Sequence, residues 1–128
     1  MKPDFIIYTR MLEVQQWIFD KVNTFPKKQR FVLGQQIETS ALACLRLIIQ
    51  ANNLKNPEKT LLKLDDLNTE LEVLRGLLRI GFEMKFLSAK SLGHITKRID
   101  EVGKMTGGWI KTARDKRLPT IRAVEVEQ

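Results

Sequence analysis

Residues 56–81 read NPEKTLLKLDDLNTELEVLRGLLRIG and carry the longest apolar pattern of the sequence. Leucines recur there at alternating spacings of three and four residues and lead to Gly81: Leu64, Leu67, Leu71, Leu74 and Leu78. Side chains spaced in this way share one face of an α-helix, so the pattern predicts a long helix with one buried stripe. Asn56, Pro57 and Glu58 indicate its start, because they supply a capping side chain, a proline at the first helical position and an acid in the first turn.

Three further segments repeat the helical spacing. Their apolar stripes are Met11, Val14, Trp17 or Ile18, and Val22; Phe31, Leu33, Ile37, Ala41, Cys44 or Leu45, and Ile48; and Leu92, Ile95, Ile99, Val102, Thr106 and Trp109. Pro26 ends the first of these helices, since proline disfavours helical geometry in the residue before it. Ser88 or Ser91 can cap the last. No segment alternates with period two, so the sequence predicts an all-α, up-down-up-down antiparallel four-helix bundle.

The chain of 128 residues is expected to form one domain over residues 1–118, followed by a tail at residues 119–128. The tail alternates apolar and polar residues after Pro119, and it is either disordered or an extended segment that adds to a neighbour. The single cysteine excludes an internal disulfide and fits a reducing compartment. No apolar run is expected to approach the ~20 residues of a membrane span. These features predict a cytoplasmic protein with no membrane partner.

The excess positive charge lies in the last third of the sequence. Residues 85–122 hold ten lysines and arginines against three acids, whereas the rest of the chain carries equal numbers of the two. Such a basic surface is typical of a protein that binds a polyanion or an acidic protein. It is also explained as a solvent-exposed charged face that aids solubility. Cations that would track phosphates repeat along the last helix and its extension: Lys97, Arg98, Lys104, Lys111, Arg114, Lys116 and Arg117. A second cluster follows the first helix: Lys27, Lys28 and Arg30.

Arg75 and Arg79 are four residues apart and share one face of the third predicted helix. They either contact nucleic acid or pair with nearby acids such as Glu72, Glu83, Asp100 and Glu101. Contacts to phosphate give salt-sensitive affinity without reading sequence. Trp109 is the one aromatic near the basic track and is expected to be buried. We therefore expect a protein that binds shape and charge, not a platform for stacking single strands.

All seven glycines fall inside predicted helices, where each costs about 1 kcal/mol relative to alanine. Small residues four apart let neighbouring backbones approach closely. We therefore predict helix or subunit contact, with Trp109 filling the adjoining volume, at Gly76, Gly81, Gly103, Gly107 and Gly108. The alternative is that the glycines are merely tolerated.

The end of the last helix carries a resemblance. Residues 103–110 read GKMTGGWI, preceded by Glu101 and Val102 and followed by cations. This resembles the accessory variability determinant (Avd) family of diversity-generating retroelements, which shares a four-helix fold with proteins encoded by intervening sequences of bacterial 23S ribosomal RNA genes. The likeness spans residues 8–112. Supporting motifs are Phe25-Pro26-Lys27-Lys28, Gly34-Gln35-Gln36-Ile37, Leu74-Arg75, Leu78-Arg79 and Ser88.

The resemblance implies a non-catalytic protein without a cofactor. Avd-like proteins form a ring-like homopentamer with a basic surface, bind nucleic acid, and associate with a reverse transcriptase that copies a template RNA with adenine-directed errors. The implied function is an RNA- or DNA-binding accessory subunit of that enzyme in mutagenic retrohoming. The intervening-sequence relatives imply an alternative, a structural or protein-interaction bundle without intrinsic nucleic-acid binding.

The sequence gives little indication of a catalytic or metal site. His94 is the only histidine, and no carboxylate or cysteine stands at ligand spacing beside it. Cys44 lies among apolar residues, where a free cysteine behaves as a small hydrophobe. Asp65, Asp66 and Glu70 are better explained as a solvated helical face than as a metal cluster. A ligand-binding bundle would need inward Glu and His pairs, which the sequence does not show.

Overall fold

The computed structural model describes residues 5–127, with side chains placed for residues 5–117. The chain forms four long helices, α1 (Ile6–Val22), α3 (Gln35–Asn53), α4 (Pro57–Glu83) and α5 (Ala89–Glu127). A short α2 (Lys27–Gln29) and a π-helical turn, η1 (Arg30–Gly34), lead directly into α3. Residues 5–127 contain no strand.

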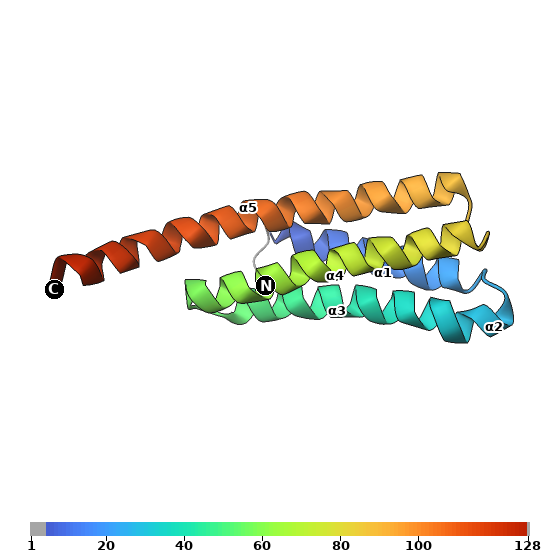
Figure 1. Ribbon diagram of the computed structural model, residues 1–128, viewed down its shortest axis with the longest axis horizontal. Helices are drawn as coiled ribbons and strands as arrows, with labels where there is room; N and C mark the ends of the chain where they lie inside the picture. Colours follow the sequence, from blue (N-terminus) through green and yellow to red (C-terminus); the bar gives the residue numbers. More distant parts are fainter. Residues whose placement is uncertain (1–4, 128) are drawn as a thin grey trace.

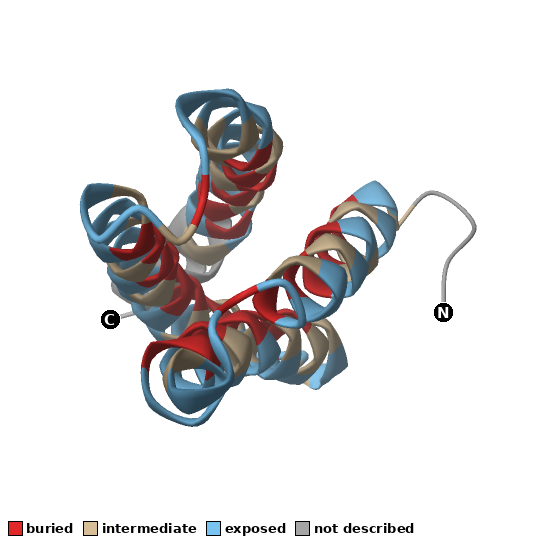
Figure 2. Ribbon diagram, turned by 90° about the vertical axis from the view of Figure 1, so that its right-hand side faces the viewer, coloured by how far each residue is buried: buried red, intermediate tan, exposed pale blue. Residues whose placement is uncertain are grey.

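The long helices lie side by side, and successive helices run in opposite directions (Figure 1). α1 packs against α3 and α5, and α4 packs against the same two helices, so each helix has two neighbours. Viewed from one end, the buried residues occupy the sides of the helices that face one another (Figure 2). The predicted all-α four-helix bundle is confirmed.

The helix that decides the fold begins and packs as its sequence predicts. The Asn56 side chain accepts hydrogen bonds from the backbone N–H groups of Glu58 and Lys59, at 2.9 and 3.3 Å. All five leucines that recur along α4 are buried in the core. At the start of α5 the Ser88 hydroxyl accepts a hydrogen bond from the N–H of Ser91 at 3.1 Å, which confirms Ser88 as the cap.

One residue predicted for the core lies outside it. Phe31 is 70% exposed. It belongs to η1, where π-helical hydrogen bonding places more residues in each turn and rotates Phe31 away from the stripe that resumes at Leu33. Gly34 permits this turn to pack, because a Cβ atom there would lie only 2.5 Å from Cγ1 of Val22.

α5 continues through Pro119 to Glu127 and projects beyond the other three helices (Figure 1). The backbone of residues 119–127 is therefore helical, neither disordered nor extended. Residue 128 lies outside the described residues. Proline has no backbone N–H, so α5 lacks one intrahelical hydrogen bond at Pro119.

By length and composition alone, the continuous helical stretch Lys27–Asn53 is apolar enough to cross a membrane. The core helix of a bundle has the same length and composition, so this stretch does not contradict the expectation that no apolar run approaches a membrane span. Its apolar stripe is buried in the bundle at Ile37, Ala41, Cys44 and Ile48. Packing of α3 against α1 and α4 accounts for the apolar character of this helix.

Candidate nucleic-acid interface

One face of α5 presents lysines at every second turn. Seven residues make nearly two helical turns, so side chains with this spacing line up along the helix. Five exposed cations share the face, and we call them the α5 ridge: Lys90, Lys97, Lys104, Lys111 and Arg114. The positions between them on the same face are also exposed: Gly93, Asp100 and Gly107. At 1.5 Å per residue the ridge is about 36 Å long, close to one turn of a nucleic-acid duplex.

The sequence predicted four of the five ridge residues and missed Lys90. The signal that could have found it is the repeat of seven, since Lys90 stands seven residues before Lys97. Lys116 is also exposed, but it lies on another side of α5, facing the connection between α3 and α4.

Most of the arginines predicted to contact nucleic acid are placed differently from the lysines. Four of them close ion pairs within the chain: Arg75–Asp100 (3.1 Å), Arg79–Glu83 (2.8 Å), Arg98–Glu13 (3.6 Å) and Arg117–Glu58 (3.6 Å). For Arg75 and Arg79 these contacts correspond to the second of the two predicted roles, pairing with acids. Pairs this exposed contribute at most about 1 kcal/mol each. Their main effect on the site is that a carboxylate offsets the charge of each arginine.

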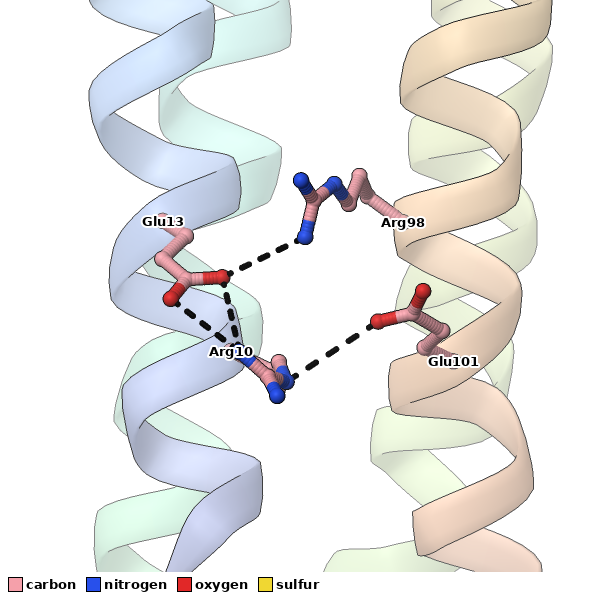
Figure 3. Close-up of polar contacts among 4 residues, drawn as sticks. All are labelled: Arg10, Glu13, Arg98 and Glu101. Carbon is pink, nitrogen blue, oxygen red and sulfur yellow. Dashed lines mark hydrogen bonds and ion pairs between the residues drawn. The ribbon is translucent and has the colours of Figure 1, made fainter.

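Arg98 belongs to a four-residue network between α1 and α5 (Figure 3). Glu13 pairs with Arg10 at 3.2 Å on its own helix and with Arg98 across the interface. Arg10 in turn lies 3.9 Å from Glu101. Two cations and two acids alternate, so the network has no net charge. Its geometry suits a link between the helices better than an anion site.

Arg75 crosses from α4 to α5 over Gly103. A Cβ atom on Gly103 would lie 3.0 Å from Nη2 of Arg75, so the glycine leaves room for the guanidinium that pairs with Asp100. A shallow groove of about 640 Å³ lies beside this contact. Further residues that line it are Asn68, Lys97, Glu101 and Lys104. Gly103 therefore accommodates a side chain, where the sequence predicted close approach of a backbone.

Among the other glycines predicted to pack, only Gly81 has a close neighbour, because its Cβ would lie 3.1 Å from Cδ2 of Leu87. Added Cβ atoms at Gly76, Gly107 and Gly108 would meet nothing within 4 Å among the described residues. Close packing within the chain was therefore a wrong prediction for these three. Contact with another subunit at these glycines stays a prediction.

Trp109 is half-buried, where the sequence predicted a buried ring. It packs edge-on with Phe5, with ring centroids 5.6 Å apart and an angle of 87° between the planes. It therefore sits against the start of α1 and does not fill a space between glycines. Part of the indole borders open hollows on the surface of the bundle.

The second predicted cluster lies in α2 and η1, at the end of the bundle where α5 begins (Figure 1). Lys27 and Lys28 are exposed, and neither forms an ion pair with a residue whose side chain the structure describes. Arg30 makes a local hydrogen bond, since its Nε donates to the carbonyl oxygen of Phe25 at 2.9 Å. Two lysines thus face solvent there, and the arginine closes the turn.

Cys44 and His94 lie in ordinary structural environments. Burial, and to a lesser extent the nearby Glu70 carboxylate, raises the pKa of the Cys44 thiol to about 12, so the thiol stays protonated. His94 is exposed beside Trp17, with ring centroids 5.9 Å apart. Within the described residues, no three His, Cys, Asp or Glu side chains gather closely enough to hold a metal ion.

Comparison with known proteins connects this arrangement to a family. A family model described as bAvd-like matches residues 5–113, which include all of α1, α3 and α4 and the part of α5 that packs in the bundle. No curated protein matches the chain significantly. The match confirms the resemblance found in the sequence: the chain belongs to the bAvd-like family.

Proposed function

We propose that this protein is a non-catalytic accessory protein that binds RNA or DNA and associates with the reverse transcriptase of a retroelement in the cytoplasm. Membership of the bAvd-like family supports the accessory role. The α5 ridge is the observation that carries nucleic-acid binding. Association with the reverse transcriptase is inferred from the resemblance to the Avd family. No residue of this chain is assigned to the interface with that enzyme.

The α5 ridge can bind the phosphate groups of a nucleic acid because its charges are exposed and regularly spaced. None of its four lysines forms an ion pair with a residue whose side chain the structure describes. Asp100, the acid on the same face, is itself paired with Arg75. A lysine ammonium is a compact charge that binds phosphate without reading the base, so this face supports binding by backbone and shape.

Self-association, expected as a homopentamer from the resemblance, is part of the proposal. An outward face of α4 and the residue directly after it carry large apolar side chains, which we call the α4 stripe: Leu62, Val73, Ile80 and Met84. Gly76 stands between Val73 and Ile80 with open space above it. An exposed apolar row with a glycine at its centre favours close approach of a second helix.

The test of nucleic-acid binding is a salt titration with structured RNA, duplex DNA and an RNA–DNA hybrid. Each phosphate contact contributes about 0.9 to the slope of log affinity against log salt on a duplex. A triple variant, Lys97→Ser, Lys104→Ser and Lys111→Ser, should therefore flatten the slope by about 3. The charge-matched control is Arg46→Ser, Lys59→Ser and Lys63→Ser on α3 and α4, which should leave the slope nearly unchanged. Absence of binding by the wild type at low salt would reject the proposal.

The arginine pairs favour the second candidate, a structural or protein-interaction bundle. Arg75, Arg79, Arg98 and Arg117 all meet acids of the chain itself, as they would in a protein without a polyanion partner. Binding of an acidic protein, together with no nucleic-acid binding at any salt concentration, would establish this candidate instead. Co-purification of the chain with the retroelement's reverse transcriptase would separately support the accessory role.

A further inference from the structure

Phe31 presents an aromatic ring to solvent at the end of the bundle where α5 begins (Figure 1). Its side chain is 70% exposed, more than any other large apolar side chain that the structure describes. A ring exposed to this extent is not covered on both faces, so one face is free for a ligand. Single apolar side chains on a surface are common, and the case for a site therefore depends on what surrounds the ring.

The ring borders a hollow of about 490 Å³ between the end of α1 and the start of α3. We call it the Phe31 hollow, and the residues that line it are Val22, Asn23, Arg30, Phe31, Gln35 and Glu38. Four of the five residues around the ring are polar. The two amides supply donors and acceptors, the guanidinium supplies donors, and the carboxylate supplies acceptors.

The turn that carries Phe31 is strongly basic. Residues 27–34 include Lys27, Lys28 and Arg30 and no acid. None of these three cations forms an ion pair with a residue whose side chain the structure describes. The hydrogen bond from Nε of Arg30 to the carbonyl oxygen of Phe25 fixes that guanidinium beside the ring. Unpaired cations next to an exposed aromatic ring favour a ligand that has both phosphates and bases.

We propose that the Phe31 hollow binds the base of an unpaired nucleotide, with the ring of Phe31 stacked on one face of the base. The amides of Asn23 and Gln35 bond the edge of the base, and Lys27 and Lys28 hold the flanking phosphates. The inference rests on the proposed nucleic-acid function and adds to it a site for a single-stranded segment. It departs from the sequence-based expectation of a binder of shape and charge alone, which counted Phe31 with the core.

A nucleotide fits this surface better than a protein partner does. A stable protein interface buries about 800 Å² on each side around an apolar centre. Val32 is the neighbouring exposed apolar residue, but it does not line the hollow, so the ring stands alone among polar groups. One aromatic face with polar groups beside it is the usual means by which proteins hold an unpaired base.

Glu38 predicts which bases the hollow prefers. Its carboxylate repels phosphate, so the base and not the backbone occupies the hollow. A carboxylate accepts a hydrogen bond from the exocyclic amino group of cytosine, which uracil lacks. We therefore expect oligocytidine to bind more tightly than oligouridine, although the two bases have rings of the same size.

The experiment measures binding of a short, end-labelled single-stranded oligoribonucleotide by fluorescence anisotropy. The same strand with abasic sites keeps the phosphates and removes the bases. We expect the wild type to bind the intact strand about tenfold more tightly than the abasic strand. Phe31→Leu keeps an apolar side chain without an aromatic face and should lose this difference, whereas Phe31→Tyr should keep it.

Phe19→Leu is the matched control for Phe31→Leu. Phe19 is 40% exposed in the last turns of α1, at the same end of the bundle, and does not line the hollow. Its replacement should leave the affinities for both strands unchanged. Circular dichroism checks that each variant stays helical. Duplex binding is measured for each variant as well and should keep its wild-type value, because the α5 ridge is intact.

Two further variants test the rest of the site. Lys27→Ser with Lys28→Ser should weaken binding of intact and abasic strands alike, because these lysines contact phosphate. Glu38→Met should abolish the preference for oligocytidine over oligouridine, which a role of Glu38 in helix packing alone would not do. Equal binding of the two homopolymers by the wild type would remove Glu38 from the site.

The outcomes separate this site from the proposed function. Equal affinity of the wild type for intact and abasic strands, while duplexes still bind, overturns the base site and leaves the α5 ridge function standing. Loss of all nucleic-acid binding by the wild type overturns both. Unchanged strand affinity in Phe31→Leu also overturns the site, and a lower mass of the assembled protein would then assign the ring to a contact between subunits. A loss confined to the intact strand in Phe31→Leu, and absent in Phe19→Leu, supports the site.

Discussion

Gln15 is a polar residue enclosed in the core of α1, only 5% exposed. Neither its amide nitrogen nor its carbonyl oxygen has a hydrogen-bond partner among the described residues. A buried polar group without a partner costs about 1 to 3 kcal/mol, whereas an apolar group of similar shape costs little. The surrounding residues of α1, Met11, Val14 and Ile18, are fully buried and apolar. Gln15 therefore lowers the free energy of unfolding at one position of an otherwise apolar stripe.

We predict that Gln15→Met stabilises the fold by about 1 to 2 kcal/mol, because methionine nearly matches glutamine in shape and needs no partner. Urea unfolding measures this as a higher midpoint with an unchanged slope. Gln16→Met is the matched control, since Gln16 is exposed and its replacement should change stability by less than about 0.5 kcal/mol. A destabilised Gln15→Met would mean that water or a second subunit satisfies the amide.

Cys44 makes stability depend on pH. Burial raises the pKa of its thiol from its ordinary value to about 12, so the folded state holds this proton more tightly than the unfolded state. The stabilisation that the protonated Cys44 thiol gives the folded state is therefore complete below the ordinary thiol pKa of about 8.5. It is lost as the pH rises from there towards the pKa of Cys44 in the folded protein.

We predict that the free energy of unfolding falls more between about pH 8.5 and about pH 11 in the wild type than in Cys44→Ala, which has no thiol to ionise. The comparison of slopes isolates Cys44, because every other ionisable group is common to both proteins. A thiol reagent should also react with Cys44 at neutral pH only after denaturant is added. Parallel pH curves together with rapid labelling of the native protein would contradict the buried, protonated thiol.

At the scale of the elements, glycines in the helices fall into two kinds. Gly34 lies in η1 against α1, where a Cβ atom would be 2.5 Å from Cγ1 of Val22 and 3.3 Å from the carbonyl oxygen of Gln29. Gly107 lies on the exposed face of α5, where a Cβ atom would meet nothing within 4 Å among the described residues. The same substitution should therefore have opposite effects at the two positions.

We predict that Gly34→Ala destabilises the fold by about 1 to 2 kcal/mol, because buried Val22 and the turn must shift to admit the methyl group. Gly107→Ala serves as the comparison and should stabilise α5 by up to about 1 kcal/mol through helix propensity. Thermal or urea unfolding of the two single variants measures both effects. Equal stabilisation by both would show that η1 tolerates a side chain at Gly34.

The elements that the sequence predicted well are those governed by local chemistry. The cap at Asn56 and the leucine stripe of α4 depend on residues within a few turns of each other, and both were confirmed. Phe31 was misplaced because η1 departs from the α-helical period, and that departure is accommodated where Gly34 meets Val22, twelve residues earlier in the chain. Periodicity in one segment carries no information about such a contact.

The candidate site was less predictable for the same reason. Lysines of the α5 ridge share one helix, so their common face follows from spacing alone. The partner of Arg117 is Glu58, which lies in another helix and is brought close only by the bundle. Exposure of Trp109 likewise depends on α1 and α3, whose ends surround it. Composition could locate the basic third of the chain, but it could not separate paired arginines from exposed lysines.

At the scale of the whole molecule, the α4 stripe is the surface that a single bundle leaves unexplained. Val73 and Ile80 are 46% and 47% exposed and stand two turns apart on one outward face. Isolated apolar residues on a surface are common, but a row along one helix face marks an interaction surface. If copies of the chain assemble through this face, a charge placed on it should separate them without harming the core.

We predict that Val73→Lys with Ile80→Lys converts the assembled protein to a monomer of 14.8 kDa while its helix content and melting temperature as a bundle are kept. Sedimentation velocity or light scattering over a range of concentrations measures the mass. Asn68→Lys is the control, because it places one cation on another exposed side of α4 and should leave the assembly intact. A wild type that is monomeric at every concentration would reject self-association. A double variant that keeps the wild-type mass would instead show that the subunits meet elsewhere, and the open glycines of α5, Gly107 and Gly108, would then be the next positions to substitute.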